Sequence, residues 1–249
     1  MHVAIVMDGS GRWALARGAT RPAGHARGVQ RVREIVTSAP ALGVDVLTLY
    51  AFSSDNWKRP PAEVSGLMRL FERYLRVEAR ELQRAGVRLT VIGRRDRIPP
   101  ALRRRMEAVE HTTRHGSRLW LRLAIDYSSR EALRRAAEAT WALPVWSREA
   151  FDCRVASGRG EPSDTPDVDL LVRTGGEQRL SDFLLWECAY AEFWFTKTRW
   201  PAFGAAELGA AIEAFSGRVR RFGGLGTEKT QTSKPQITPI SQIRSSSRA

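Results

Sequence analysis

Cysteine is scarce in this chain, and long apolar runs are missing. The 249 residues include two cysteines, Cys153 and Cys188, whose spacing matches neither a disulfide framework nor a zinc site. No apolar stretch approaches the roughly 18–20 residues of a membrane span, and no signal-like segment opens the chain. We therefore expect a reduced, cytoplasmic protein with buried thiols.

Lysine is also rare, although the charge is strongly basic. The chain has 40 Lys and Arg against 27 Asp and Glu, a formal net charge of +13. Only four of these 40 residues are lysines, so 36 are arginines. The planar fork of arginine donors suits phosphate and carboxylate. The balance indicates an anionic partner: nucleic acid, an acidic membrane surface or a phosphorylated small molecule.

The hydrophobic fraction of 43%, with eight Trp and nine Phe, is enough for a sizeable core. Strand-like and helix-like stretches alternate, which favours a single α/β domain with a mostly parallel central sheet flanked by helices. That domain is expected over residues 1–222. Residues 223–249 are rich in Ser, Thr, Pro and Gln, and are expected to form a disordered tail. The expected strands are 2–7, 44–52, 87–93, 118–126, 168–173 and 190–196, and the expected helices are 22–42, 61–85, 99–115, 129–142 and 202–222.

Three polar loops follow predicted strands, after Met7, Phe52 and Val172. Ligands of parallel sheets bind outside the carboxyl ends of the strands, so these loops are the candidate site. In the first loop, Asp8 precedes two glycines that let backbone amides converge on an anion. A divalent cation between Asp8 and a phosphate would suit Mg²⁺, which binds through one carboxylate and substrate phosphates. The alternative is a tight turn in which Asp8 is only a helix cap.

The same loop matches a variant of the dinucleotide-binding fingerprint at Gly9, Gly11 and Ala14. The rest of that pattern is missing, because the second strand ends near Phe52 rather than about 20 residues after the loop. Glu34, at the expected spacing, falls inside a predicted helix. A nicotinamide cofactor is therefore not expected.

The other two loops add cations and hydroxyl groups. Residues 53–60 read SSDNWKRP, which is also typical of a solvated turn. In residues 173–181, Arg173 and Arg179 flank two glycines, an arrangement suited to bidentate phosphate contacts. Arg21 and His25 form a further cationic pair, and Glu192 lies among aromatic residues, where a lone carboxylate is costly unless it is paired or bound to metal. Together these residues predict a metal-dependent diphosphate site beside an apolar wall.

Five motifs in order, HVAIVMDGSGRW, RPAGHARG, LTLYAFSSDNWKRP, VDLLVRTGGEQRLSDFLLW and AYAEFWF, resemble those of the cis-prenyltransferases, the undecaprenyl diphosphate synthase family. The resemblance covers the chain from residue 2 to Gly224. It implies a homodimer with a hydrophobic tunnel under the sheet. It also implies Mg²⁺-dependent condensation of isopentenyl diphosphate with an allylic diphosphate, giving Z double bonds.

The resemblance also assigns roles to individual residues. It makes Asp8 the metal-associated catalytic aspartate, Glu192 a second metal-linked carboxylate, and Asn56 a group that helps to remove the isopentenyl proton. The allylic diphosphate is expected at Gly9, Ser10, Gly11, Arg12, Arg21 and His25. The isopentenyl side and other substrate contacts are expected at Trp13, Ser53, Ser54, Asp55, Trp57, Arg59, Arg173, Arg179, Leu180 and Ser181.

Some residues depart from the family motifs. Ser10 stands where Asn is usual, Asp55 replaces the commoner Glu, and Gln178 replaces His. Residues 126–129 read DYSS instead of the usual NYGG, which could reshape one edge of the pocket. The apolar stripe of helix 61–85 is read both as a core face and as a tunnel wall, with Ala51 leaving room. Product length therefore stays open.

Three alternatives remain. The first is a short-chain synthase that makes a C10–C20 product, and the second is a non-catalytic prenyltransferase-like subunit. The third, a nucleic-acid-binding protein, is disfavoured because the aromatic residues fall mostly in apolar segments. No nucleic-acid partner is expected, whereas a peripheral membrane contact would serve release of a lipid product.

Overall fold

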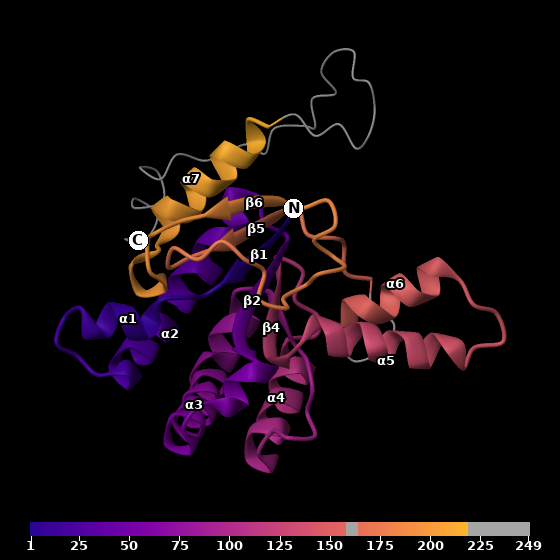
Figure 1. Ribbon diagram of the computed structural model, residues 1–249, viewed down its shortest axis with the longest axis horizontal. Coiled ribbons are helices and arrows are strands. Elements are labelled where there is room, and N and C mark those ends of the chain that lie inside the picture. Colours follow the sequence, from indigo (N-terminus) through magenta and orange to yellow (C-terminus); the bar gives the residue numbers. More distant parts are fainter. Residues whose placement is uncertain (158–163, 219–249) are drawn as a thin grey trace.

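The computed structural model describes residues 1–157 and 164–218. Its centre is a six-stranded sheet in which all neighbouring strands are parallel, in the order β3-β4-β2-β1-β5-β6 (Figure 1). This architecture confirms the predicted fold class. The strands are β1 (His2–Val6), β2 (Val46–Ser53), β3 (Val87–Ile92), β4 (Leu119–Tyr127), β5 (Leu170–Arg173) and β6 (Glu192–Phe195).

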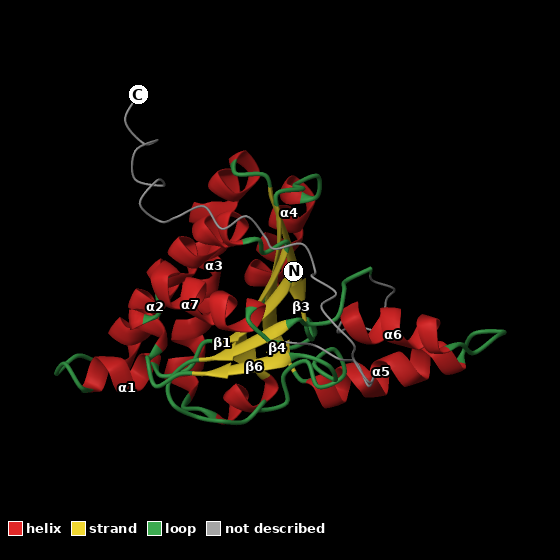
Figure 2. Cartoon of the chain, turned by 90° about the horizontal axis from the view of Figure 1, so that it is seen from above, coloured by secondary structure: helices red, strands yellow, loops and turns green. Residues whose placement is uncertain are grey.

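Helices cover both faces of this sheet (Figure 2). Helices α2, α3, α4 and α7 bury their apolar sides in one cluster, and α5 contributes to a second cluster on the opposite face. The helices are α1 (Ser10–Leu15), α2 (Arg21–Ser38), α3 (Pro61–Arg84), α4 (Pro100–Thr113), α5 (Ser129–Trp141), α6 (Arg148–Ser157) and α7 (Ala205–Ser216), with short 3-10 turns η1 (Ala39–Leu42), η2 (Ser54–Lys58) and η3 (Trp200–Ala202).

Strand β1 shows why two clusters form. Successive side chains of a strand point to opposite faces. Val3 and Ile5 accordingly join the cluster under α2 and α3, whereas Ala4 and Val6 join the cluster that contains Phe183 and Leu184. All four residues are buried, as expected for a parallel strand covered on both faces.

Most predicted elements are found within a few residues of their predicted limits, with two corrections. No helix was predicted between the first strand and residue 22, but Ser10–Leu15 is helical. Helix α6 was not predicted at all. The last helix was expected over 202–222, and α7 covers Ala205–Ser216 of it. Residues 219–222 and the expected tail at 223–249 lie outside the described residues. None of the helices in the described part is long and apolar enough to cross a membrane.

Candidate functional site

A polar cavity of about 290 Å³ opens at the carboxyl ends of β1, β2 and β5. This is where the strand order reverses, because the chain runs from β1 toward β2 on one side and later adds β5 on the other. Open α/β sheets bind ligands at such a point. Four arginines line the cavity, Arg12, Arg21, Arg59 and Arg173, together with Asp8 and His25.

Asp8 is held between two of these arginines. Its Oδ1 accepts a hydrogen bond from Arg12 (3.1 Å) and its Oδ2 one from Arg173 (3.0 Å). Partial burial alone would raise the pKa of Asp8, but the hydrogen bonds and charges of Arg173 and Arg12 outweigh it and hold the pKa below its ordinary value. Asp8 is not a helix cap, since Gly9 occupies the N-cap of α1 and no side chain caps that helix.

The backbone around Asp8 is closely packed. Gly9 has a φ of 96°, which favours glycine, and a Cβ at this position would crowd the Arg199 side chain. A Cβ at Gly175 (φ 87°), in the loop after β5, would lie about 3.0 Å from the backbone of Asp8, so this loop packs closely against it. Thr174 adds a hydroxyl that bonds both the backbone nitrogen and the carbonyl of Asp8, each at 2.9 Å. The two loops therefore hold Asp8 in one position.

The loop after β2 forms a single 3-10 turn. Ser53 and Asn56 close a capping box, in which the Ser53 hydroxyl accepts from Asp55 N and the Asn56 carbonyl oxygen accepts from Ser53 N. This turn directs Ser53, Asn56 and Arg59 to the cavity. Ser54 donates instead to the buried Asp126 (2.9 Å), and Asp55 pairs with Lys58 at the surface.

Of the site residues predicted in the loop after β5, some line the cavity and others do not. Arg173, 4% exposed, lines the cavity and donates to the Ser181 hydroxyl at 2.7 Å. Ser181 also lines it. The Arg179 side chain is exposed and pairs with Glu177, so in this arrangement only its backbone carbonyl, which accepts from Arg173, supports the site. Leu180 packs against the apolar cluster on the α5 face.

Arg21 and His25 were predicted as a cationic pair, but His25 also has an acidic neighbour, Glu63, that was not predicted. His25 Nε2 lies 3.7 Å from Glu63, which also accepts from Arg59 at 3.1 Å. Burial, followed by the charge of Arg59, lowers the pKa of His25, so the imidazole is neutral at neutral pH. Arg59 and Glu63 are four residues apart at the start of α3, a spacing that would have predicted the ion pair.

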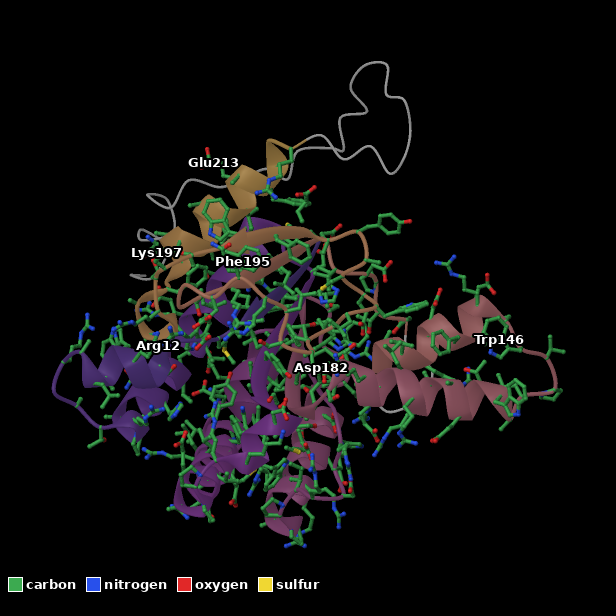
Figure 3. The ribbon with its side chains drawn as sticks, viewed as in Figure 1. Arg12, Trp146, Asp182, Phe195, Lys197 and Glu213 are labelled. Carbon is green, nitrogen blue, oxygen red and sulfur yellow. The ribbon has the colours of Figure 1, made fainter. Side chains whose placement is uncertain are left out.

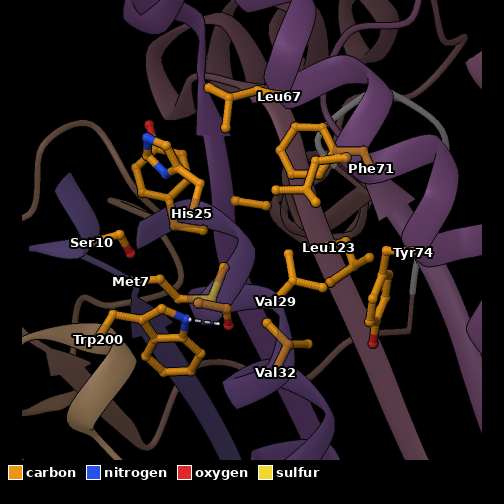
Figure 4. A pocket seen from close by; sticks show the side chains of 14 residues that line it. Met7, Ser10, His25, Val29, Val32, Leu67, Phe71, Tyr74, Leu123 and Trp200 are labelled. Atoms are coloured by element: carbon orange, nitrogen blue, oxygen red, sulfur yellow. Dashed lines mark hydrogen bonds between the residues drawn. The ribbon is translucent and has the colours of Figure 1, made fainter. Parts of the chain in front are cut away.

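A second, apolar cavity of about 90 Å³ continues from the polar one between α2 and α3 (Figure 4). The two cavities share Met7, Ser10, His25, Tyr50, Ala51 and Leu67. Beyond these residues the lining is mostly aliphatic and aromatic, including Val29, Val32 and Phe71. The two cavities thus adjoin each other: charged side chains line the first, and apolar side chains line most of the second.

Glu192 does not share a site with Asp8 within one chain. It begins β6 opposite Leu170, which pairs with Val3 of β1. Asp8 follows Val3 by five residues, about 15 Å along the strand direction. The carboxylate of Glu192 pairs with Arg218. Across residues 1–157 and 164–218, no group of three His, Cys, Asp or Glu side chains could hold a metal ion.

Two predicted aromatic contacts, and the pocket edge at 126–129, lie beside the cavity rather than in it. The Trp57 ring packs edge-on against Phe52, and the Arg17 guanidinium stacks over Trp13. Ser128 caps α5, and the Ser129 hydroxyl accepts from Leu185 N, so neither lines a cavity described here. The predicted residues that do line the polar cavity are Asp8, Gly9, Ser10, Gly11, Arg12, Arg21, His25, Ser53, Asn56, Arg59, Arg173 and Ser181.

Comparison with known proteins gives a consistent picture. The family model described as "Putative undecaprenyl diphosphate synthase" matches residues 6–223. The chain is 54% identical over 225 residues to isoprenyl transferase 1 of Bradyrhizobium diazoefficiens, covering 90% of each. It is 45% identical to a ditrans,polycis-undecaprenyl-diphosphate synthase ((2E,6E)-farnesyl-diphosphate specific) of Xanthomonas axonopodis pv. citri, covering 89% of this chain and 88% of that protein. The crystal structure of lavandulyl diphosphate synthase from Lavandula x intermedia, in complex with dimethylallyl diphosphate, superposes with a TM-score of 0.83 at 34% identity, covering 89% of this chain and 97% of that one.

Proposed function

Because this chain belongs to the undecaprenyl diphosphate synthase family of cis-prenyltransferases, we propose that it lengthens a Z-prenyl chain by condensing isopentenyl diphosphate with an allylic diphosphate. One observation carries the proposal: a cavity with four arginines around Asp8 continues into an apolar cavity. A prenyl diphosphate has the same division into a multiply charged head and a hydrocarbon tail.

The two diphosphates would bind to different parts of the polar cavity. The amides of Gly9–Arg12, with Arg21 and His25, would hold the allylic diphosphate. Arg59, Arg173 and Ser181 would hold isopentenyl diphosphate, since both loops face the same cavity. In the reaction the allylic carbon–oxygen bond breaks, a carbon–carbon bond forms to the isopentenyl unit, and one proton leaves. The arginines would stabilise the negative charge that develops on the departing diphosphate.

Asn56 would assist removal of the proton. Its carbonyl oxygen accepts the Ser53 backbone N–H, which fixes the side chain at the rim of the cavity. The neutral His25 would donate a hydrogen bond without adding a charge, while Arg21 and Arg59 supply the charge.

The residues present fit Mg²⁺ as a cofactor. Mg²⁺ is usually bound through one or two carboxylates plus substrate phosphates, and Asp8 supplies one carboxylate in the lining of the polar cavity. When bound, the ion would neutralise charge on the leaving diphosphate. Glu192 lies on the edge strand away from Asp8. We therefore propose Glu192 as a metal-linked carboxylate only across two chains of a homodimer.

The activity is tested by incubating the protein with labelled isopentenyl diphosphate and farnesyl diphosphate, with and without Mg²⁺. Dephosphorylated products are separated by reversed-phase chromatography. We expect Asp8→Ala to lower incorporation by about 10²–10³-fold, because the carboxylate that accepts from Arg12 and Arg173 in the polar cavity is lost. Asp45→Ala, which removes a surface carboxylate 83% exposed, is the control. Full Mg²⁺-dependent incorporation by Asp8→Ala would refute the catalytic assignment.

The same chromatogram separates the remaining alternatives. A short-chain synthase would give C10–C20 alcohols, whereas a non-catalytic subunit would incorporate no label. The presence of Asp8, Asn56 and Arg173 around one cavity supports catalysis. The small volume of the apolar cavity, about 90 Å³, favours the short-chain alternative as the second candidate.

A homodimer is proposed as the working assembly. The support is a set of exposed aromatic side chains away from the cavity, on the α5–α6 connection and on the edge strand (Figure 3). Trp146 is 58% exposed, and Phe193 and Phe195 stack on each other along β6. Exposed apolar patches of this kind mark interfaces. Sedimentation equilibrium should give twice the chain mass, and Phe193→Asp should shift it toward the monomer.

Product release is proposed to occur at a membrane surface, from the cytoplasmic side. Each buried CH₂ group holds the lipid by about 0.8 kcal/mol, so longer products are bound more tightly. The net charge of +13 would favour an anionic surface. Anionic phospholipid vesicles should therefore raise the steady-state rate. An unchanged rate with a long product would refute this step.

A further inference from the structure

Three cavities lie one after another along the groove between α2 and α3. Both helices begin at the carboxyl edge of the sheet, since α3 follows β2 and α2 follows the loop after β1. The polar cavity is at their first turns, and the apolar cavity comes next. A third cavity of about 120 Å³ lies near their last turns, where Val36, Pro40 and Ala85 contribute to its lining.

Among the residues that the structure describes, Tyr74 is the one side chain that lines both the apolar cavity and the third cavity. It follows Leu67, at the mouth of the apolar cavity, by seven residues, which places it about 10 Å further along α3. Its ring lies opposite Val32 of α2 and close to Leu123 of β4 (Figure 4). The residue is only 8% exposed, so its ring is buried where the two linings meet.

The lining changes character beyond Tyr74. In the third cavity Glu78 accepts hydrogen bonds from Arg33, one of them at 3.1 Å, and Glu81 and Arg118 add further charges. Glu78 is one helical turn beyond Tyr74 on the same side of α3. Hydrocarbon that passed Tyr74 would meet an ion pair, and desolvating that pair is unfavourable. The apolar path therefore ends at the Tyr74 ring.

We propose that Tyr74 is the residue that limits product length: elongation stops when the far end of the prenyl chain reaches its ring. This inference rests on the proposed prenyl elongation and adds the group that determines its extent. Because Tyr74 is remote from the diphosphate cavity, it would act on the length of the product and not on the chemistry of each condensation.

The test compares product lengths made by the wild-type protein, Tyr74→Ala, Tyr74→Leu and Tyr74→Phe. We expect Tyr74→Ala and Tyr74→Leu to join the two cavities and shift the most abundant product to a longer chain by at least one isoprene unit. Tyr74→Phe keeps the ring and should leave the distribution unchanged. KM for isopentenyl diphosphate should stay within twofold in all variants, which separates a length effect from damage to the site. Tyr74→Leu keeps much of the buried volume and carries the test where Tyr74→Ala does not fold.

Leu75→Ala is the matched control, since Leu75 is 1% exposed on the same helix but lines none of the three cavities. It should leave product length unchanged. Longer products from Leu75→Ala as well would overturn the proposal, because general loosening would then explain them. An unchanged length in Tyr74→Ala and Tyr74→Leu would also overturn it while leaving the elongation activity established. Failure of the wild-type protein to incorporate label would instead refute the proposed function.

Discussion

Asp126 is a fully buried carboxylate that holds two side chains beside the candidate site. It accepts two hydrogen bonds from Arg97 and one from Ser54 at 2.9 Å, and the Arg97 guanidinium lies 5.5 Å from the Trp57 ring centroid. Its φ of 52° is in the left-handed region, which is costly for a residue other than glycine unless its surroundings fix it. Asp126 therefore positions the turn that carries Asn56.

Removing this carboxylate should weaken binding on the isopentenyl side. We expect Asp126→Ala to lower kcat/KM for isopentenyl diphosphate by about 10–100-fold, because the turn at 54–58 loses its anchor and its cavity-lining side chains shift. KM for the allylic substrate should change little, since α1 and α2 are not attached to Asp126. Steady-state kinetics with each substrate varied in turn gives both constants.

Asp126→Asn should recover part of the loss, as the amide oxygen still accepts from Ser54. Asp96→Asn is the control, because Asp96 precedes Arg97 but pairs with Arg94 at the surface. If both KM values rise equally in Asp126→Ala, the effect is a general loss of structure and the positioning role is wrong.

Individual residues show where the sequence was a sufficient guide. Asp8 and Arg173 were predicted because each lies where an apolar strand ends, and strand ends meet at one edge of a parallel sheet. Asn56 was predicted from the resemblance to the family motif. Backbone conformation determines which predicted residues lie outside the cavity. The direction of the Arg179 side chain depends on the turn through Gly175 and Gly176, both at positive φ, which residue types alone do not specify.

Contacts between elements were still harder to predict. Asp126 was noticed only as a departure from the family motif, because the contact with Arg97 depends on how the loop before α4 folds back over β4. Glu63 was overlooked although its spacing from Arg59 is typical of a helical ion pair.

At the scale of elements, the packing of α1 against α2 depends on Gly24. A Cβ at this position would overlap the carbonyl oxygen of Ser10 and crowd the methyl group of Ala14. Gly24→Ala should therefore destabilise the protein by about 1–3 kcal/mol and lower activity, because α1 carries Arg12 and the amides of the site. Urea denaturation followed by circular dichroism measures the change.

Gly66 on α3 is the matched control for this substitution. A Cβ there would have only the tip of Arg69 within 4.0 Å. Gly66→Ala should therefore stabilise the protein by about 0.5–1 kcal/mol, the usual gain from removing a glycine from a helix interior. If Gly24→Ala and Gly66→Ala changed the free energy of unfolding in the same direction, Gly24 would not be a contact position between α1 and α2.

The elements themselves were largely predictable from periodicity. Residues 61–85 repeat apolar side chains at helical spacing, and α3 covers Pro61–Arg84. Helix α1 was overlooked because its six residues, which follow Gly9 and include Gly11, are too few to show a period. Helix α6 was overlooked because its polar and apolar residues do not separate into two faces.

At the scale of the whole molecule, two buried ionisable groups lie on the sheet face away from the apolar cavity. His2 is 0% exposed, and its ring bonds Pro166 O and the Thr48 hydroxyl, each at 2.8 Å. Burial, together with the charge of Arg122, lowers its pKa to about 3. Glu187 is 2% exposed, and burial raises its pKa to about 7.

These two groups should affect the pH dependence of stability with opposite signs. The folded-state pKa of His2 is below its ordinary value of 6.5, so its contribution is full above about pH 6.5 and is lost as the pH falls. The folded-state pKa of Glu187 is above its ordinary value of 4.5, so its contribution is full below about pH 4.5 and is lost as the pH rises through 7. Each slope is about 1.4 kcal/mol per pH unit, so between about pH 4.5 and 6.5 they nearly cancel.

Replacing one of these two residues should leave the pH dependence that the other gives to the free energy of unfolding uncompensated. Between about pH 6.5 and pH 5, we expect the free energy of unfolding of His2→Gln to rise by about 2 kcal/mol relative to the wild-type protein, and that of Glu187→Gln to fall by a similar amount. Urea denaturation at both pH values measures these differences, in which the contributions of all unchanged groups cancel. Two variants that retained the wild-type pH profile would show that neither group is protonated differently in the folded and unfolded states. Opposite slopes would instead show that the chain buries a neutral imidazole and a protonated carboxyl group near Arg122, so that stability stays level while the diphosphate site at the carboxyl ends of the strands keeps its charges.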